Sequence, residues 1–445
     1  MNANRCIMSY AISTGPHSYL TGKSSGILLA VAFAIGCAAN TQAQDIVRPS
    51  LTRSYAPDSR LYVSEEPNYN IRVGSISLLM DASVFAEFND NVNLSSVNKQ
   101  SDIIVRPSIG VTAKWELSDL NSVTLHLGAG YAFYLNGNNG GGSGFTLEPG
   151  SELAVNLFSG DFKIRIYDSF SLTDTPIDSV GYSNVDNFGQ FSNTAGIAVT
   201  WQLSDIAATV GYSHNNIVGT SGNYDYLDSV TDQIYGNVYY AINPTWGVGI
   251  EGAYSATRYD QNVQNDATGY NLGVFVEGTL TENFSFRAAV GYQAITFDEH
   301  NGPTIVPGLV GSLGNDTSDF GGIYANLGFT HTINQYVTQE LTIGREGLLG
   351  VNSNYIDLFY VRHTTKWNII KDVDLITRLF YEKATESGSV NAEDASRYGA
   401  SIGASYQIAP SWILSGEYGY IKKNSNLDFR DYTQNRVLIG ITYQF

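Results

Sequence analysis

Apolar and polar residues alternate along most of this chain. In the final run, Val437–Phe445, the odd-numbered positions are apolar and end on an aromatic residue, whereas the even-numbered positions other than Leu438 are small or polar. Side chains of an extended strand point alternately to opposite faces. The run therefore predicts a strand with one apolar face. We expect it to pair with the first strand of a closed sheet, because an open edge strand invites aggregation.

From Val73 onward one unit recurs: an alternating strand of about ten residues, a very short turn, a second strand and a longer polar connection. The short turns are predicted at Ser118-Asp119, Ser159-Gly160, Ser204-Asp205, Asn243-Pro244, Thr281-Glu282-Asn283, Asn334-Gln335, Ile370-Lys371 and Ala409-Pro410. The longer connections include Asn136–Gly144, Asp174–Gly189, Asp298–Ser318, Glu386–Ala395 and Asn424–Asp431. The pattern predicts an all-β, antiparallel up-and-down transmembrane β-barrel over residues 73–445, with about eighteen strands and sixteen as the alternative.

The tryptophans give a second view of the same barrel. Each of the 5 lies within a few residues of a predicted short turn. Indole prefers the membrane interface, because its body is apolar and its N–H is polar. We therefore expect a periplasmic aromatic girdle and periplasmic N- and C-termini. The girdle comprises Trp115, Trp201, Trp246, Trp367 and Trp412.

The strand face opposite the tryptophans carries most of the strand charges. An Arg or Lys facing lipid at mid-membrane costs about 2–4 kcal/mol, so we expect these charges to face the lumen. Candidate lumen-lining residues are Arg165, Arg287, Arg378, Arg436, Glu251 and Glu417. Two interpretations stay open: acids and bases pair across neighbouring strands and stiffen the wall, or the arginines form a ladder for an anionic solute. Acids and bases are nearly equal in number on this face, which predicts no strongly cationic pore.

Several aromatic residues fall on the same inward face. They are Tyr167, Tyr235, Tyr239, Phe275, Tyr324, Tyr360 and Phe380. Aromatic faces stack on sugar rings, so these residues would suit a path for a glycan. Ordinary packing between the wall and an inward loop explains them equally well.

The N-terminal region carries an export signal. An apolar stretch, Gly26–Ile35, follows basic residues and precedes a small-x-small cleavage site at Thr41–Ala43. We expect residues 1–43 to be a signal peptide, with Met1 or Met8 as the start, and residues 44–72 to be a periplasmic lead-in. Cleavage would remove both cysteines, which excludes disulfides and thiolate chemistry in the mature chain.

Composition and charge narrow the class of function. Charged residues make up 15% of the chain, against about 25% in typical soluble proteins. The net charge of -18 argues against nucleic acid and against binding an anionic surface through a basic patch. No histidine lies in a nucleophile motif, so we expect no enzyme, catalytic residue or cofactor. The acidic stretches at Asn89–Asn91 and Asn315–Asp319 match no metal-binding motif, so we expect no metal site.

Two short segments carry a family resemblance. Phe88-Asn89-Asp90-Asn91-Val92, followed by Ser101–Pro107, resembles the opening hairpin of the putative β-barrel porin 2 family. Members are often encoded beside genes for exopolysaccharide synthesis and export. The C-terminus resembles the signal read by the barrel-assembly machinery. Its residues are Gly440, Tyr443 and Phe445.

The resemblance implies an outer-membrane channel that takes part in export of an extracellular polysaccharide. Its expected partners are outer-membrane lipid, the barrel-assembly machinery, the polysaccharide and periplasmic export components. A general diffusion porin is the alternative from the same class. A structural or adhesive surface protein that acts through its extracellular loops is the alternative from another class. The sequence predicts neither the solute nor the oligomeric state.

Overall fold

The computed structural model describes residues 69–137, 143–175, 179–185, 187–298, 316–388 and 392–445. The predicted signal peptide and both candidate start codons lie outside these residues. The predicted lead-in over residues 44–72 is described only from Tyr69 onward, and the first strand begins two residues later.

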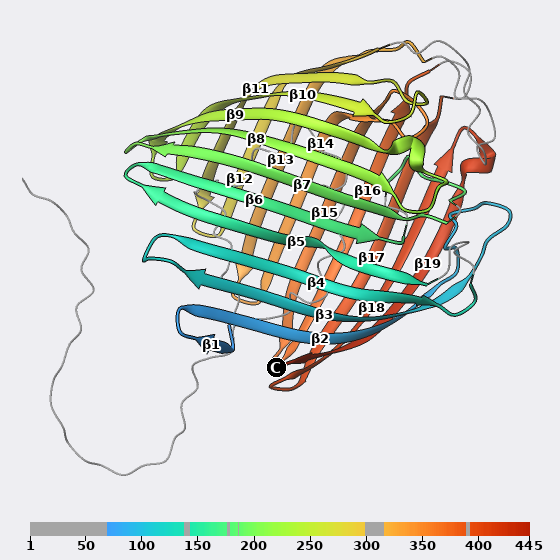
Figure 1. Cartoon of the computed structure of the whole chain (residues 1–445), viewed down its shortest axis with the longest axis horizontal. Helices are drawn as coiled ribbons and strands as arrows, with labels where there is room; N and C mark the ends of the chain where they lie inside the picture. Colours follow the sequence, from blue (N-terminus) through green and yellow to red (C-terminus); the bar gives the residue numbers. More distant parts are fainter. Residues whose placement is uncertain (1–68, 138–142, 176–178, 186, 299–315, 389–391) are drawn as a thin grey trace, which may run out of the picture. The chain divides into compact units, whose positions relative to one another are not determined.

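The described chain forms one antiparallel sheet that closes into a barrel (Figure 1). Strands β2 to β19 pair in chain order, and β19 pairs back with β2, which gives a closed 18-strand barrel. The predicted all-β barrel of about eighteen strands is confirmed, and the alternative of sixteen is wrong. The strands are β1 (Ile71–Val73), β2 (Ile76–Asn89), β3 (Asp102–Glu116), β4 (Ser122–Tyr134), β5 (Gly144–Ser159), β6 (Phe162–Thr173), β7 (Gln190–Gln202), β8 (Ile206–Gly219), β9 (Ser229–Asn243), β10 (Trp246–Tyr259), β11 (Ala267–Thr281), β12 (Phe284–Phe297), β13 (Phe320–Asn334), β14 (Val337–Leu349), β15 (Tyr355–Ile370), β16 (Val373–Glu386), β17 (Asp394–Ala409), β18 (Trp412–Ser425) and β19 (Tyr432–Gln444).

The two ends of the barrel differ in their connections. Every predicted short turn falls at the junction of two successive strands, from β3–β4 to β17–β18, and these junctions form the short-turn end. The longer connections form the opposite, long-loop end, which also includes residues 90–101, 220–228, 260–266 and 350–354. Two of them contain short 3-10 helices, η2 (Asp225–Leu227) and η3 (Asp428–Arg430). Within the described ranges, no helix combines the length and the apolar character needed to cross a membrane.

Aromatic residues form two belts on the outer face of the wall. Four predicted girdle residues, Trp115, Trp201, Trp367 and Trp412, are 42–47% exposed near the short-turn end. Outward tyrosines lie nearer the long-loop end, including the register pairs Tyr254–Tyr270 and Tyr381–Tyr398. Tyr254 is eight residues beyond Trp246 in β10. Eight residues of a strand tilted by about 40° rise roughly 20 Å, close to the apolar band of about 25 Å in membrane barrels.

The seam between β2 and β19 closes the barrel. Their register runs from Arg436–Asn89 to Gln444–Asp81. Beyond it, the backbone N–H of Phe445 donates to the carbonyl of Met80 at 3.0 Å. On the same edge of β2, the residues before Asp81 pair with β1. Strand β1 therefore continues this edge of the sheet beyond the end of β19.

Candidate functional site

Four arginines inside the barrel share one arrangement. In each, the guanidinium lies over an aromatic ring, and the ring covers a glycine directly opposite it on a neighbouring strand. The guanidinium carbon of Arg287, for example, lies 4.4 Å from the ring centre of Phe275, which faces Gly249 in register. The other units are Arg165–Tyr167–Gly196, Arg362–Tyr360–Gly344 and Arg397–Phe380–Gly399.

The glycines make these units possible. A Cβ added at Gly249 would collide with the ring of Phe275, and the other three glycines are equally crowded by their rings. A glycine thus leaves the space in which a ring can lie against the wall. A cation over such a ring is attracted by about 0.5–2 kcal/mol.

Each predicted lumen arginine is paired with a glutamate. Arg287 pairs with Glu251, and Arg378 pairs with Glu417 at 3.0 Å, so four of the six candidate residues meet in two pairs. The other two candidates pair with glutamates outside that set. They form the pairs Arg165–Glu152 and Arg436–Glu87. The arrangement matches the hypothesis of acid–base pairing across the wall and leaves no ladder of free cations among these four arginines.

Four of the seven inward aromatic residues are packed into the wall, whereas Tyr167, Tyr239 and Phe380 are half-buried. Tyr324 and Tyr360 are each 1% exposed, and the hydroxyl of Tyr324 donates to Glu251 at 2.9 Å. Tyr235 and Phe275 are also buried, each over a glycine. These rings offer no open face to a sugar, so the packing interpretation accounts for them.

The exposure of the inward ion pairs changes along the barrel. Near the short-turn end, the side chains of Lys366 and Glu340 are 54% and 48% exposed. Near the long-loop end, those of Lys423 and Glu393 are 0% and 2% exposed. These two ion pairs are therefore open to solvent at the short-turn end and buried at the long-loop end.

A segment between β6 and β7 fills part of the long-loop end. We call residues 179–189, without the undescribed residue 186, the inward segment. Its Val180 packs against Ile356, Tyr360 and Ala384 on β15 and β16. Because β15 is nine strands away from β6 in the eighteen-stranded ring, the segment reaches the opposite wall.

Hydrogen bonds hold the inward segment in place. The backbone N–H groups of Asn184 and Val185 donate to the carbonyls of Leu94 and Asn93 at 3.0 and 2.8 Å. The Asn184 side chain also donates to the carbonyl of Phe429 at 2.8 Å. Asn184 has a positive φ of 54°, a conformation that asparagine tolerates better than most residues. The segment is therefore bound to the connections β2–β3 and β18–β19.

An apolar cluster surrounds these bonds. Tyr182 and Phe188 of the segment meet edge to face, with ring centres 5.6 Å apart. They pack with residues from three other connections and from β19. The buried members are Leu94, Tyr182, Val185, Phe188, Tyr226, Leu227, Val351 and Tyr432. The long connections thus share a small core of their own.

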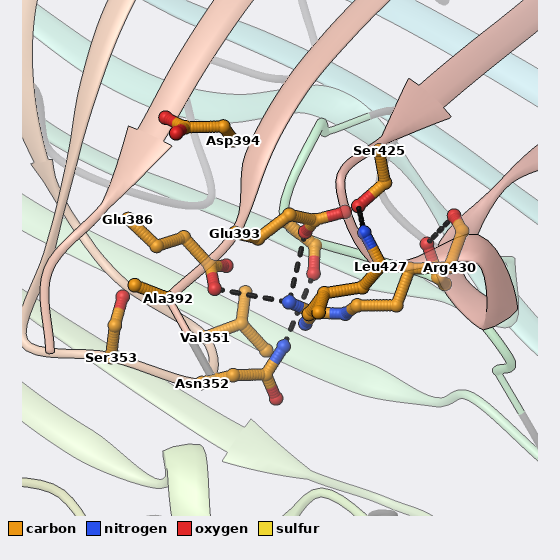
Figure 2. A network of polar contacts seen from close by, with 12 residues as sticks. Val351, Asn352, Ser353, Glu386, Ala392, Glu393, Asp394, Ser425, Leu427 and Arg430 are labelled. Carbon is orange, nitrogen blue, oxygen red and sulfur yellow. Dashed lines mark hydrogen bonds and ion pairs between the residues drawn. The ribbon is translucent and has the colours of Figure 1, made fainter. Parts of the chain in front are cut away.

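A buried network of charges fastens the segment to β18. The ammonium of Lys423 lies 3.0 Å from the Ser183 hydroxyl and 2.9 Å from Glu393. Figure 2 shows Arg430 between Glu386 and Glu393, at 3.0 and 2.9 Å. Two cations meet two anions, so the network is neutral. Removing one partner of such a buried network costs about 3–5 kcal/mol, because a charge is left uncompensated.

Sequence reasoning missed this network. Lys423 could have been found, because it shares the inward parity of Glu417 in β18. Glu393 and Arg430 lie in connections, where no alternation predicts direction. Within the described residues, no group of three or more His, Cys, Asp or Glu is arranged to hold a metal ion.

Comparisons with known proteins concern the barrel. No protein-family model matches the chain, and no curated protein matches it. The outer membrane protein OpdK of Pseudomonas aeruginosa is 10% identical, with a TM-score of 0.46 over 83% of this chain and 99% of that one. A BenF-like porin of Pseudomonas fluorescens Pf-5 is 10% identical, with a TM-score of 0.48 over 84% and 100%. At these identities the likeness extends to the fold and to nothing finer.

Proposed function

We propose that this chain is a diffusion channel of the bacterial outer membrane, narrowed by the inward segment. Two features support the membrane placement: an apolar outer face between two aromatic belts, and a charged inner face. A barrel of 16–18 strands is wide enough for an aqueous path. We place the short turns and both chain ends in the periplasm and the long connections outside the cell, as is usual for such barrels.

The observation that carries the proposal is the docking of the inward segment on β15 and β16. The exposed pair Lys366–Glu340 marks a wet vestibule on the short-turn side of the segment. The buried pair Lys423–Glu393 marks the narrow part. Such a channel would pass small hydrophilic solutes and exclude large ones.

The long connections would set a preference for cations. Their described acids are Asp90, Asp174, Asp225, Asp228, Asp260, Asp266, Asp298, Asp316, Asp319, Glu393, Asp428 and Asp431. The basic residues in the same described connections are Lys99 and Arg430. An acidic mouth raises the local concentration of cations and repels anions.

Export of a polysaccharide, which the family resemblance implies, stays a prediction without support from the interior. The buried rings do not form a sugar path, and a polymer would require the inward segment to leave the lumen. An adhesive role has no specific feature in its favour.

Swelling of liposomes tests the proposal. We expect vesicles that contain the purified protein to swell in isosmotic arabinose and to swell far more slowly in a large oligosaccharide. The absence of swelling with any solute, for a protein shown to be folded, would contradict the channel. Equal rates for both solutes would contradict the narrowing.

A further inference from the structure

Charged residues on the outer face of the barrel strands are few and unevenly placed. On β6, β9 and β10 they are Asp168, Asp232 and Arg258. On β14–β18 they are Arg345, Asp357, Lys383, Asp394 and Lys422. Three of the four outward cations therefore lie on β14–β18.

The register brings these cations together. Arg345 and Lys383 stand on either side of Phe359 in one row across β14, β15 and β16. Lys422 of β18 lies one row nearer the short-turn end, opposite Tyr398 of β17. The two lysines are two strands apart across the sheet and are offset by two residues along the strand direction. Their Cα atoms are therefore about 12 Å apart. Each lysine side chain extends roughly 6 Å, so both ammonium groups can reach one anion.

The two lysines are uncommitted, unlike their neighbours. Arg345 forms a bidentate pair with Asp357, whose shorter contact is 2.7 Å. Asp394 accepts a hydrogen bond from Thr385 at 2.8 Å. In the part of the chain that the structure describes, neither the side chain of Lys383 nor that of Lys422 has a hydrogen-bond or ion-pair partner. A pair of free cations on the outer wall of an acidic protein calls for an anionic ligand.

The surface below the lysines is apolar. Toward the short-turn end, the outward row beneath Lys383 contains the pair Tyr381–Tyr398. In the following row, the small Ala400 lies between Leu379 and Tyr420. Cations above an apolar surface match the order of headgroup and acyl chain in a membrane lipid.

We propose that the outer face of β14–β18 binds the phosphate group of a membrane lipid, with Lys383 and Lys422 as its ligands. The apolar surface of Leu379, Ala400 and Tyr420 receives an acyl chain. The proposal rests on the membrane placement proposed above but does not depend on conduction through the channel. It also refines the expectation from net charge, because the total of -18 conceals a local excess of cations.

Native mass spectrometry of the full chain in detergent tests this site, with diphosphorylated lipid A as the probe. We expect the variant Lys383→Gln/Lys422→Gln to bind it roughly 30-fold more weakly than the wild type. The control Arg258→Gln/Lys371→Gln loses the same charge elsewhere and should bind like the wild type. Lipid A without phosphates should bind the wild type as weakly as the phosphorylated form binds the lysine variant.

Three outcomes would overturn the proposal. They are wild-type affinity of the lysine variant for lipid A, equal affinity of the wild type for both forms of lipid A, and displacement of lipid A by an equimolar amount of inorganic phosphate. Heat-modifiable gel migration verifies that each variant is folded. The lysine variant should keep the swelling rates of the wild type. Failure of the lipid site would therefore be distinguishable from failure of the channel.

Discussion

The ring of Phe85 in β2 lies over Gly440 in β19, directly opposite it at the seam that closes the barrel. A Cβ added at Gly440 would clash with this ring. The same relation of ring to glycine recurs in the four arginine units of the wall. The glycine of the predicted assembly signal therefore also has a packing role at the closure.

Substitution of Gly440 tests that role. We expect Gly440→Ala to destabilise the folded barrel by about 1–3 kcal/mol, because the added methyl group displaces the ring. The temperature at which the folded band disappears from a gel measures the change. Gly419→Ala on β18 is the matched control, since the nearest atom to its Cβ is 3.8 Å away. Equal effects of the two substitutions would contradict the packing role.

Removal of a buried charge should cost far more than removal of an exposed one. Glu382 is 3% exposed and pairs with both Arg362 and Arg397 at 3.1 and 2.8 Å. We expect Glu382→Gln to lower the free energy of unfolding by about 3–5 kcal/mol. Glu340→Gln, in an exposed pair with Lys366, should cost less than about 1 kcal/mol. Urea unfolding in lipid vesicles compares them, and similar midpoints would refute the assignment of buried and wet halves.

The network around Lys423 should control access to the inward segment. The absence of cysteine from the described residues makes Val180→Cys a clean reporter. We expect the thiol at this buried position to react slowly, and Lys423→Met to speed its labelling by about tenfold or more. Lys422→Met, on the outer face of the same strand, should leave the rate unchanged. Unchanged labelling in the Lys423 variant would show that the network does not hold the segment.

The acidic long connections should give the channel a cation preference. In a gradient of KCl across a planar bilayer, we expect the reversal potential to indicate passage of K⁺ over Cl⁻. Neutralising Asp225 and Asp260 should reduce the preference for K⁺ over Cl⁻, because both residues belong to the acidic connections. Asp205→Asn at the short-turn end should have a smaller effect. An anion-selective channel would contradict this part of the account.

The alternation of apolar and polar residues with a period of two predicted the barrel well. It correctly gave the strand number and the short turns, because each strand has an apolar outer face and a polar inner face. The pairing of Arg287 with Glu277 follows from direct cross-strand register. Its contact with Glu251, two strands away, depends on strand tilt and the reach of a long side chain, which alternation does not encode.

The inward segment lay beyond sequence reasoning for a different reason. Val180 and Ile356 are far apart in the chain and belong to no shared pattern. The available signal was local: apolar residues such as Val180, Tyr182 and Val185 interrupt an otherwise polar connection. Such residues predict burial somewhere, but only the closed barrel determines which wall receives them.

Single-channel conductance in planar bilayers tests the central claim most directly. The comparison is between the wild type and a variant in which residues 179–189 are replaced by a short Gly/Ser linker. We predict small conductance steps for the wild type and steps several times larger for the variant, with both proteins folded. Identical steps would show that the segment does not narrow the path, and the absence of conductance in both would show that the barrel is not a channel.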